Sequence, residues 1–240
     1  MKHGTPRPTT PFGTPTRRRR LALVTHRPLL RVGGRTIGAM RVGIAAAVVL
    51  VLAYAYALRI GAGDPNPFDF FGYFTNQTSL LAAIVLGTVG GRLIAGRPVP
   101  SWLATARGVV TAYLIVVAVV YNVVVPGTGS APPWVSFLLH GVFPVVVLLD
   151  WILIGDRPRL PWRTLWTLLP YPAVWLAVVL IRGATDGWVP YGFLLPGRGL
   201  PSLTAHIVGL IAAIVASGAV VWALSRTKPR VVLAHPRRSR

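Results

Sequence analysis

The last long apolar segment of the chain spans residues 202–224 and reads SLTAHIVGLIAAIVASGAVVWAL, without Asp, Glu, Lys or Arg. About 20 apolar residues form a helix long enough to cross a bilayer. Segments of similar length lie near 41–60, 73–94, 103–125, 134–154 and 164–182. They are too long for strands and lack the alternation of an outer-membrane barrel, and backbone groups in lipid must bond within a helix. The sequence therefore predicts an all-α polytopic membrane protein, a bundle of six transmembrane helices.

The composition of the 240-residue chain agrees with this class. Hydrophobic residues make up 53% and charged residues 12% of the chain, and the mean hydropathy is +0.61. These values lie outside the range of water-soluble domains. The chain has no cysteine, which excludes disulfides, thiolate metal sites and cysteine nucleophiles.

The basic residues predict the orientation of the helices. The chain has 25 Lys and Arg against 5 Asp and Glu, a net charge of +20. The basic residues lie in both termini and in the second and fourth loops, and we place Arg107 in the second loop. By the positive-inside rule, both termini are cytoplasmic. Because each basic cluster is needed at an inner helix end beside anionic lipid, we expect no nucleic-acid partner.

Three parts of the chain follow from this topology. Residues 1–36 are rich in Pro, Thr, Gly and Arg and predict a disordered, basic cytoplasmic tail. Residues 37–225 form the six-helix transmembrane domain. Residues 226–240 form a second basic cytoplasmic tail.

Polar side chains inside the apolar segments point to function, because they are costly in lipid and usually face the bundle interior. At about 1.5 Å rise per residue, Thr75, His140 and His206 lie at a similar depth, roughly 6–9 Å below the outer surface. Asn122 lies near the same surface. Four helices therefore contribute to one polar layer in the outer leaflet. Asp150 is about 15 Å further along the helix than His140, so we expect no contact between the two.

Two prolines within the predicted helices release backbone carbonyl groups. Proline has no amide hydrogen, so Pro144 leaves the carbonyl of His140 without its helical partner. Pro172 has the same effect on Leu168. We expect a kink at both places and an unpaired acceptor beside the His140 imidazole.

Three functions could use the polar layer, and the residues alone leave all three open. The Thr75 hydroxyl could attack an ester while neutral His140 takes its proton, with the amide of Asn76 or Gln77 near the developing oxyanion. His140 and His206 could ligate a haem iron. Asp150 and the histidines could form a proton or substrate path in a transporter.

A family resemblance rests on three motifs: Tyr73-Phe74-Thr75-Asn76-Gln77, Leu139-His140 followed by Pro144 and Asp150, and Gly187-Trp188-Val189-Pro190-Tyr191. Their order and spacing resemble the androgen-induced protein family, six-helix membrane proteins that include threonine hydrolases of fatty acid esters of hydroxy fatty acids. The bacterial branch, usually labelled Pr6Pr, is especially similar. The resemblance covers about residues 42–224. It implies a threonine nucleophile and a histidine partner, which fall on Thr75 and His140.

Together, the residues and the resemblance predict an integral membrane protein whose outer-leaflet polar cavity hydrolyses lipid (fatty acyl) esters. The predicted catalytic residues are Thr75 and His140, and the predicted binding residues are Asn76, Gln77, Asn122, His206 and Tyr191. We expect membrane lipids and a lipid-like small molecule as partners, no metal or cofactor, and a bacterial inner membrane as the location. The alternative is a non-enzymatic lipid-binding or transport protein.

Overall fold

The computed structural model describes Met1 and residues 30–127 and 131–234. Within these residues, six helical segments are long and apolar enough to cross a membrane. The spans are α1 (Gly34–Gly61), α3 (Phe74–Ile94), α4 (Ser101–Val123), Pro133–Leu153, Trp162–Thr185 and α8 (Leu200–Leu224). The predicted six-helix bundle is confirmed, and each observed boundary lies within a few residues of the predicted one except at the start of α1.

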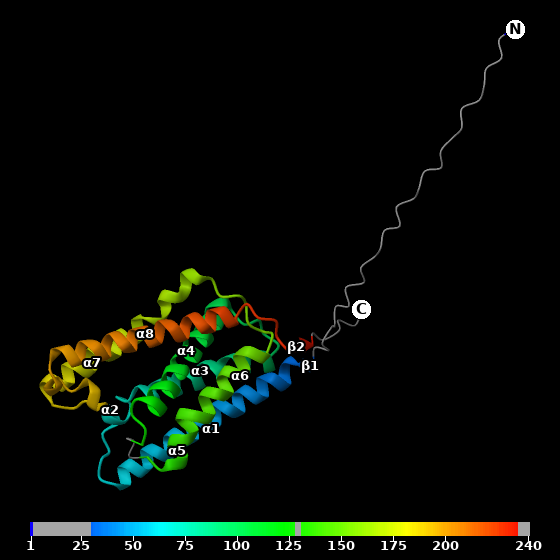
Figure 1. Ribbon diagram of the computed structural model, residues 1–240. Helices are drawn as coiled ribbons and strands as arrows, with labels where there is room; N and C mark the ends of the chain where they lie inside the picture. Colours follow the sequence, from blue (N-terminus) through cyan, green and yellow to red (C-terminus); the bar gives the residue numbers. More distant parts are fainter. Residues whose placement is uncertain (2–29, 128–130, 235–240) are drawn as a thin grey trace.

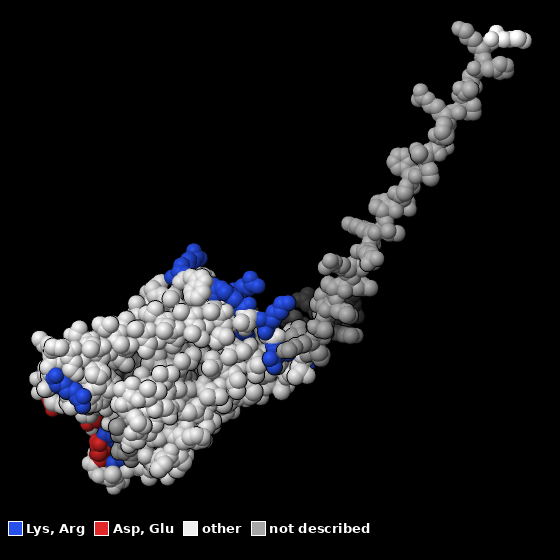
Figure 2. All heavy atoms as spheres, viewed as in Figure 1, with Lys and Arg blue, Asp and Glu red and all other residues white. Residues whose placement is uncertain are grey.

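The two ends of the bundle differ (Figure 1). At one end, here called the loop end, lie the short helix α2 (Pro67–Phe70) and the connection before α8, with the 3-10 turns η3 (Gly192–Leu194) and η4 (Pro196–Arg198). At the other, the terminal end, α1 begins and α8 ends. In Figure 2 the visible acidic side chains lie at the loop end, whereas most visible Lys and Arg lie toward the terminal end.

Strands β1 (Leu30–Gly33) and β2 (Val231–Ala234) pair in parallel at the terminal end. The pair is attached to the end of the fourth span, because Gly155 N donates to the carbonyl of Val231 at 2.9 Å. This arrangement differs from the predicted tail boundaries: helix α1 already begins at Gly34, and β2 lies inside the predicted tail 226–240. The two strands satisfy each other's backbone hydrogen-bonding groups, a pairing that the composition of either tail alone did not indicate. Residues 2–29 and 235–240 of the predicted tails lie outside the described residues.

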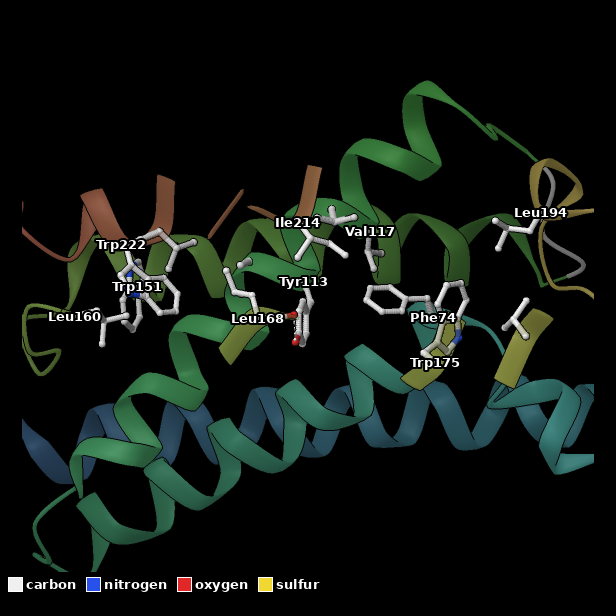
Figure 3. Packing of buried hydrophobic residues seen from close by; sticks show 14 of the residues in the cluster. Phe74, Tyr113, Val117, Trp151, Leu160, Leu168, Trp175, Leu194, Ile214 and Trp222 are labelled. Atoms are coloured by element: carbon white, nitrogen blue, oxygen red, sulfur yellow. Dashed lines mark hydrogen bonds between the residues drawn. The ribbon is translucent and has the colours of Figure 1, made fainter. Parts of the chain in front are cut away.

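Close packing fixes the helix positions. Helices α1 and α3 cross where Gly38 faces Gly90, and a Cβ atom added to either glycine would lie 2.6 Å from the carbonyl oxygen of the other. Small residues of this kind allow close helix contact in membranes. Elsewhere, large side chains fill the bundle: Figure 3 shows Trp151 and Trp222 packed near Leu160, and Phe74 beside Trp175.

The regular α-helix is interrupted at both predicted proline positions. The fourth span consists of α5 (Pro133–Phe137), a π-helical segment η1 (Leu138–Val142) and α6 (Phe143–Leu153). The fifth begins as a 3-10 helix, η2 (Trp162–Leu168), and continues as α7 (Pro170–Thr185). Side chains of α4 bond to both released carbonyl groups: Asn122 Nδ2 lies 3.3 Å from the His140 oxygen, and the Tyr113 hydroxyl lies 2.9 Å from the Leu168 oxygen. The acceptor beside His140 is therefore paired, contrary to the prediction.

Candidate functional site

The structure brings together the two residues predicted to be catalytic. Thr75 is buried in the first turn of α3, and His140 is half-buried at the centre of η1. Thr75 Oγ1 lies 3.2 Å from His140 Nε2. Separate helices thus bring a hydroxyl group and an imidazole ring into hydrogen-bonding contact near the loop end.

The second ring nitrogen determines which way the hydrogen bond of the pair runs. His140 Nδ1 lies 2.8 Å from the carbonyl oxygen of Ser136, one turn earlier. A carbonyl group can only accept, so Nδ1 carries the hydrogen and, in the neutral ring, Nε2 is the acceptor for the Thr75 hydroxyl. The ring also stacks on Tyr121, with centroids 3.6 Å apart and planes at 13°. The imidazole is therefore held in the orientation that a general base for Thr75 requires.

Two cavities adjoin this pair. One, here the rim cavity, has a volume of about 560 Å³ and lies against the end of α1 and α5, where Arg59, Asp64 and Asn76 contribute to its wall. The other, here the apolar cavity, has a volume of about 470 Å³ and lies between α4, α7 and α8. Four residues line both cavities: Thr75, Tyr121, His140 and Tyr191. The Thr75–His140 pair therefore lies where the two cavities meet.

Tyr191 is the third polar group at this boundary. It stacks on Phe193, with centroids 5.4 Å apart and planes at 2°, and makes an edge contact with Tyr73 at 5.8 Å. Burial raises the pKa of the Tyr191 phenol to about 12, and hydrogen bonding with Thr75 acts in the opposite direction. The phenol stays protonated at neutral pH and can donate a hydrogen bond beside Thr75.

The other predicted binding residues have different surroundings. Asn76 lines the rim cavity, and its amide donates to the Phe70 carbonyl at 2.7 Å. Gln77 lies outside both cavities: its amide nitrogen bonds to the Phe71 carbonyl, and its oxygen accepts from the Tyr171 hydroxyl at 2.6 Å. These bonds leave the amide nitrogen of Gln77 directed at the α2–α3 connection.

Asn122 and His206 also lie outside the two cavities. Asn122 donates to the His140 carbonyl oxygen, so it acts on the backbone of the histidine. His206 Nδ1 lies 2.7 Å from the Ser202 carbonyl, and the ring stacks on Phe193 at 5.5 Å. Both imidazoles have a backbone acceptor at Nδ1, which leaves Nε2 as the nitrogen that could bind a metal. Because His140 directs Nε2 at Thr75, the geometry does not favour haem ligation, one of the three functions that the residues left open. No group of three or more metal-ligating side chains occurs among residues 30–127 and 131–234.

Asp150 belongs to a separate cluster of charges near the terminal end. Arg41 binds Asp150 through two bonds of 2.9 and 3.1 Å, and it also binds Asp156. Arg107 binds the two oxygens of Asp156 at 3.0 and 2.8 Å. The placement of Arg107 in the second loop is therefore wrong, because it lies inside α4 with only 2% of its surface exposed. Asp150 is paired with arginine, so its position gives no support to a path with the histidines, another of the three functions left open.

Several residues at these two sites escaped the sequence analysis. Arg41 and Asp156 complete the charge cluster, and a signal for them exists: only five acidic residues occur in the chain, and Asp150 lies within the apolar fourth segment while Asp156 directly follows it. Carboxylates at such positions require buried cationic partners. Tyr121 and Ser136 hold the His140 ring. Ser136 precedes His140 by one helical turn, which is the spacing for a side-chain to backbone bond.

Comparison with protein-family models, curated proteins and solved structures gives no match to this chain. The resemblance to the androgen-induced protein family stays a prediction based on the three motifs.

Proposed function

We propose that this polytopic membrane protein hydrolyses fatty acyl esters with Thr75 as the nucleophile and His140 as the general base, and that it belongs to the bacterial branch of the androgen-induced protein family. The observation that carries the proposal is the 3.2 Å contact between Thr75 Oγ1 and His140 Nε2 at the junction of two cavities. In this proposal the termini are cytoplasmic, and the site opens toward the outer leaflet of a bacterial inner membrane.

The first half of the reaction forms an acyl-enzyme. Thr75 Oγ1 attacks the ester carbonyl carbon while its proton moves to His140 Nε2. The tetrahedral intermediate then collapses: the bond between the carbonyl carbon and the alcohol oxygen breaks, and the His140 Nε2 proton passes to the departing alcohol. The Ser136 carbonyl, which accepts from Nδ1 at 2.8 Å, stabilises the imidazolium that exists between these two proton transfers.

The second half regenerates the enzyme. Water enters from the rim cavity, loses a proton to His140 Nε2 and attacks the carbonyl carbon of acyl-Thr75. The proton returns to Thr75 Oγ1 as the bond between the acyl carbon and this oxygen breaks, which releases a fatty acid. His140 thus acts as base and acid in each half, as a single histidine does in other hydroxyl-nucleophile hydrolases.

Charge on the carbonyl oxygen requires a hydrogen-bond donor. The Tyr191 phenol is the stronger candidate, because it stays protonated and lines both cavities together with Thr75. Asn76 lines the rim cavity and is a second candidate, because its amide nitrogen carries one hydrogen besides the one donated to the Phe70 carbonyl. Gln77 is not part of the mechanism, because its amide nitrogen is bound to the Phe71 carbonyl outside the cavities.

Fluorophosphonate labelling and ester turnover of the purified protein test the proposal. Thr75→Ala should abolish labelling, and Thr75→Ala and His140→Ala should each lower turnover by at least about 10³-fold. Thr88→Ala and His206→Ala are matched controls, since Thr88 lies on α3 and bonds to the Ile84 carbonyl, and His206 bonds to the Ser202 carbonyl, both outside the two cavities. Labelling that persists in Thr75→Ala, or turnover indifferent to both substitutions, would contradict the proposal.

The apolar cavity also favours a second candidate, a non-enzymatic lipid-binding or transport protein. In that case lipid would copurify with the protein, and Thr75→Ala and His140→Ala would change the amount bound. No covalent labelling would occur. The two candidates therefore give different results in the same experiment.

A further inference from the structure

We infer that the two cavities bind opposite halves of the ester: the apolar cavity holds the acyl chain, with its depth limiting the length of that chain, and the rim cavity holds the alcohol. This assignment rests on the proposed hydrolase function and goes beyond it, because ester hydrolysis alone does not say which cavity receives which half. It also names the residues that select among substrates.

The linings of the cavities differ in chemistry. Apart from the four residues shared with the rim cavity, every residue that lines the apolar cavity is aliphatic, aromatic or proline. These side chains can pack against an acyl chain, and they give water few hydrogen-bond partners. Burial of each methylene group contributes about 0.8 kcal/mol, so the acyl half of an ester is bound most favourably here.

The rim cavity contains the polar groups that the alcohol half and water require. Arg59 and Asp64 form an ion pair on its wall, and half of the Asp64 side chain is exposed. Ser136 and Asn76 also line this cavity. The departing alcohol and the water of the second half-reaction therefore exchange on this side of Thr75, while the acyl chain stays on the other.

The apolar cavity has a defined direction and floor. The lining residues closest to the terminal end along each helix are Val116 on α4, Ile214 on α8 and Leu169 just before α7. From Ile207 to Ile214 the cavity follows α8 for about 10 Å, and from Val116 to Tyr121 it follows α4 for about 8 Å. A chain esterified near Thr75 therefore runs parallel to the helices until it meets this floor.

The side wall formed by α7 explains how a chain enters from the bilayer. Helix α7 follows the 3-10 segment η2 and carries Pro170 and Pro172 in its first turn, so it is not continuous with a regular helix on the terminal side. Its outward face exposes Val174 and Ile181 to the surroundings by 65% and 61%, and Ala173 and Ala177 line the cavity. Because Ala173 and Ala177 line the cavity and are also exposed on the outside of the bundle, we place the entry of the acyl chain from lipid at this wall.

The dependence of turnover on acyl-chain length tests this assignment of the two cavities directly. Turnover of acetyl, octanoyl and palmitoyl esters of one alcohol is compared for wild type, Leu210→Trp, Ile214→Ala and Leu58→Trp. Leu210 lines only the apolar cavity and Leu58 only the rim cavity. Leu210→Trp should lower turnover of the two longer esters by at least about tenfold relative to the acetyl ester, and Ile214→Ala should shift the preference toward palmitoyl. Leu58→Trp should affect all acyl lengths equally.

A second measurement does not depend on turnover. A photoactivatable fatty acid with a diazirine on its chain is irradiated with the full-length protein in micelles, and adducts are mapped by mass spectrometry. Adducts on Leu176, Leu210 or Ile214 support the assignment. Adducts on Leu58 or on the lipid-facing Val174, or an unchanged acyl-length profile in Leu210→Trp, overturn it even when Thr75→Ala abolishes turnover. If adducts form in the apolar cavity but turnover does not depend on Thr75, the acyl-chain site is supported and the hydrolase function is contradicted.

Discussion

Two polar clusters lie at different depths of this bundle, and they differ in whether their polar groups can reach a ligand. Toward the terminal end, Arg41 and Arg107 bind Asp150 and Asp156, and Arg41 has no exposed surface. Near the loop end, Thr75 and His140 form one neutral hydrogen bond with a cavity on each side.

The difference separates a structural cluster from a candidate reactive one. The four charged residues cancel in pairs, and the carboxylates bind arginine at both oxygens, so the cluster links α1, α4 and the end of the fourth span. The Thr75–His140 pair carries no net charge, and its hydroxyl oxygen can reach a ligand in either cavity. Polar residues in a membrane protein are thus informative about chemistry only once their partners are known.

Removing one member of the charge cluster should give the largest effect. Arg41→Met leaves Asp150 buried without its bidentate partner, and we expect it to lower the free energy of unfolding by about 3–5 kcal/mol. Unfolding with sodium dodecyl sulfate in mixed micelles measures this value. Arg97→Met, at an exposed position, should change it by less than about 0.5 kcal/mol. The double variant Arg41→Met/Asp150→Leu should recover part of the loss, and equal losses in single and double variants would contradict the pairing.

At the Thr75–His140 pair, the corresponding experiment affects rate and leaves stability unchanged. Tyr191→Phe removes the phenol hydroxyl beside Thr75, and we expect it to lower kcat for ester hydrolysis by about 10²-fold, as for the loss of an oxyanion donor. The thermal unfolding temperature should stay within a few degrees of wild type. Tyr73→Phe is the matched control because Tyr73 lines only the rim cavity and contacts Tyr191 through its ring edge. Equal rates for both variants would remove Tyr191 from the mechanism.

The sequence predicted the spans and the depths of Thr75 and His140 in the bundle, because each depends only on distances along its own helix. Apolar length locates each span, and a rise of about 1.5 Å per residue placed Thr75 and His140 in one layer. Depth does not give direction around the helix axis. Gln77 and His206 lie near the same level as Thr75 but face other partners, so their predicted roles as binding residues gain no support from their positions.

Which arginine binds which carboxylate in the charge cluster could not be predicted, for a related reason. Arg41 and Asp150 are 109 residues apart in the sequence. Their contact depends on which helices are neighbours in the bundle, and hydropathy does not contain that information. Assigning Arg107 to a loop by the positive-inside rule failed for the same reason, because a buried arginine is tolerated where a carboxylate meets it.

Acid should weaken the charge cluster gradually. Burial alone would raise the pKa of Asp156, but Arg107 and Arg41 outweigh it and hold the pKa of this carboxyl well below its ordinary value. Because the pKa is lower in the folded than in the unfolded chain, the stability from Asp156 is complete above the ordinary aspartate pKa and declines below it. We expect the free energy of unfolding to fall as the pH is lowered from about 4 to about 2, by no more than about 1.4 kcal/mol per pH unit. Asp156→Asn should be less stable at neutral pH and should lose less over this interval.

The bond from Asn122 to the His140 carbonyl should give the smallest effect. Asn122→Leu removes the side chain that bonds to the carbonyl released by Pro144. Hydrogen bonds between membrane helices contribute about 0.6 kcal/mol on average and at most about 1.7 kcal/mol, so unfolding should shift within this range. Val119→Leu, also exposed on α4, is the control. The carbonyl left unpaired belongs to His140, the proposed general base, so Asn122→Leu should also lower kcat slightly more than Val119→Leu does. Arg41→Met should leave the kcat of the folded fraction unchanged. A stability loss as large as that of Arg41→Met would mean that the neutral site is as important structurally as the charged one.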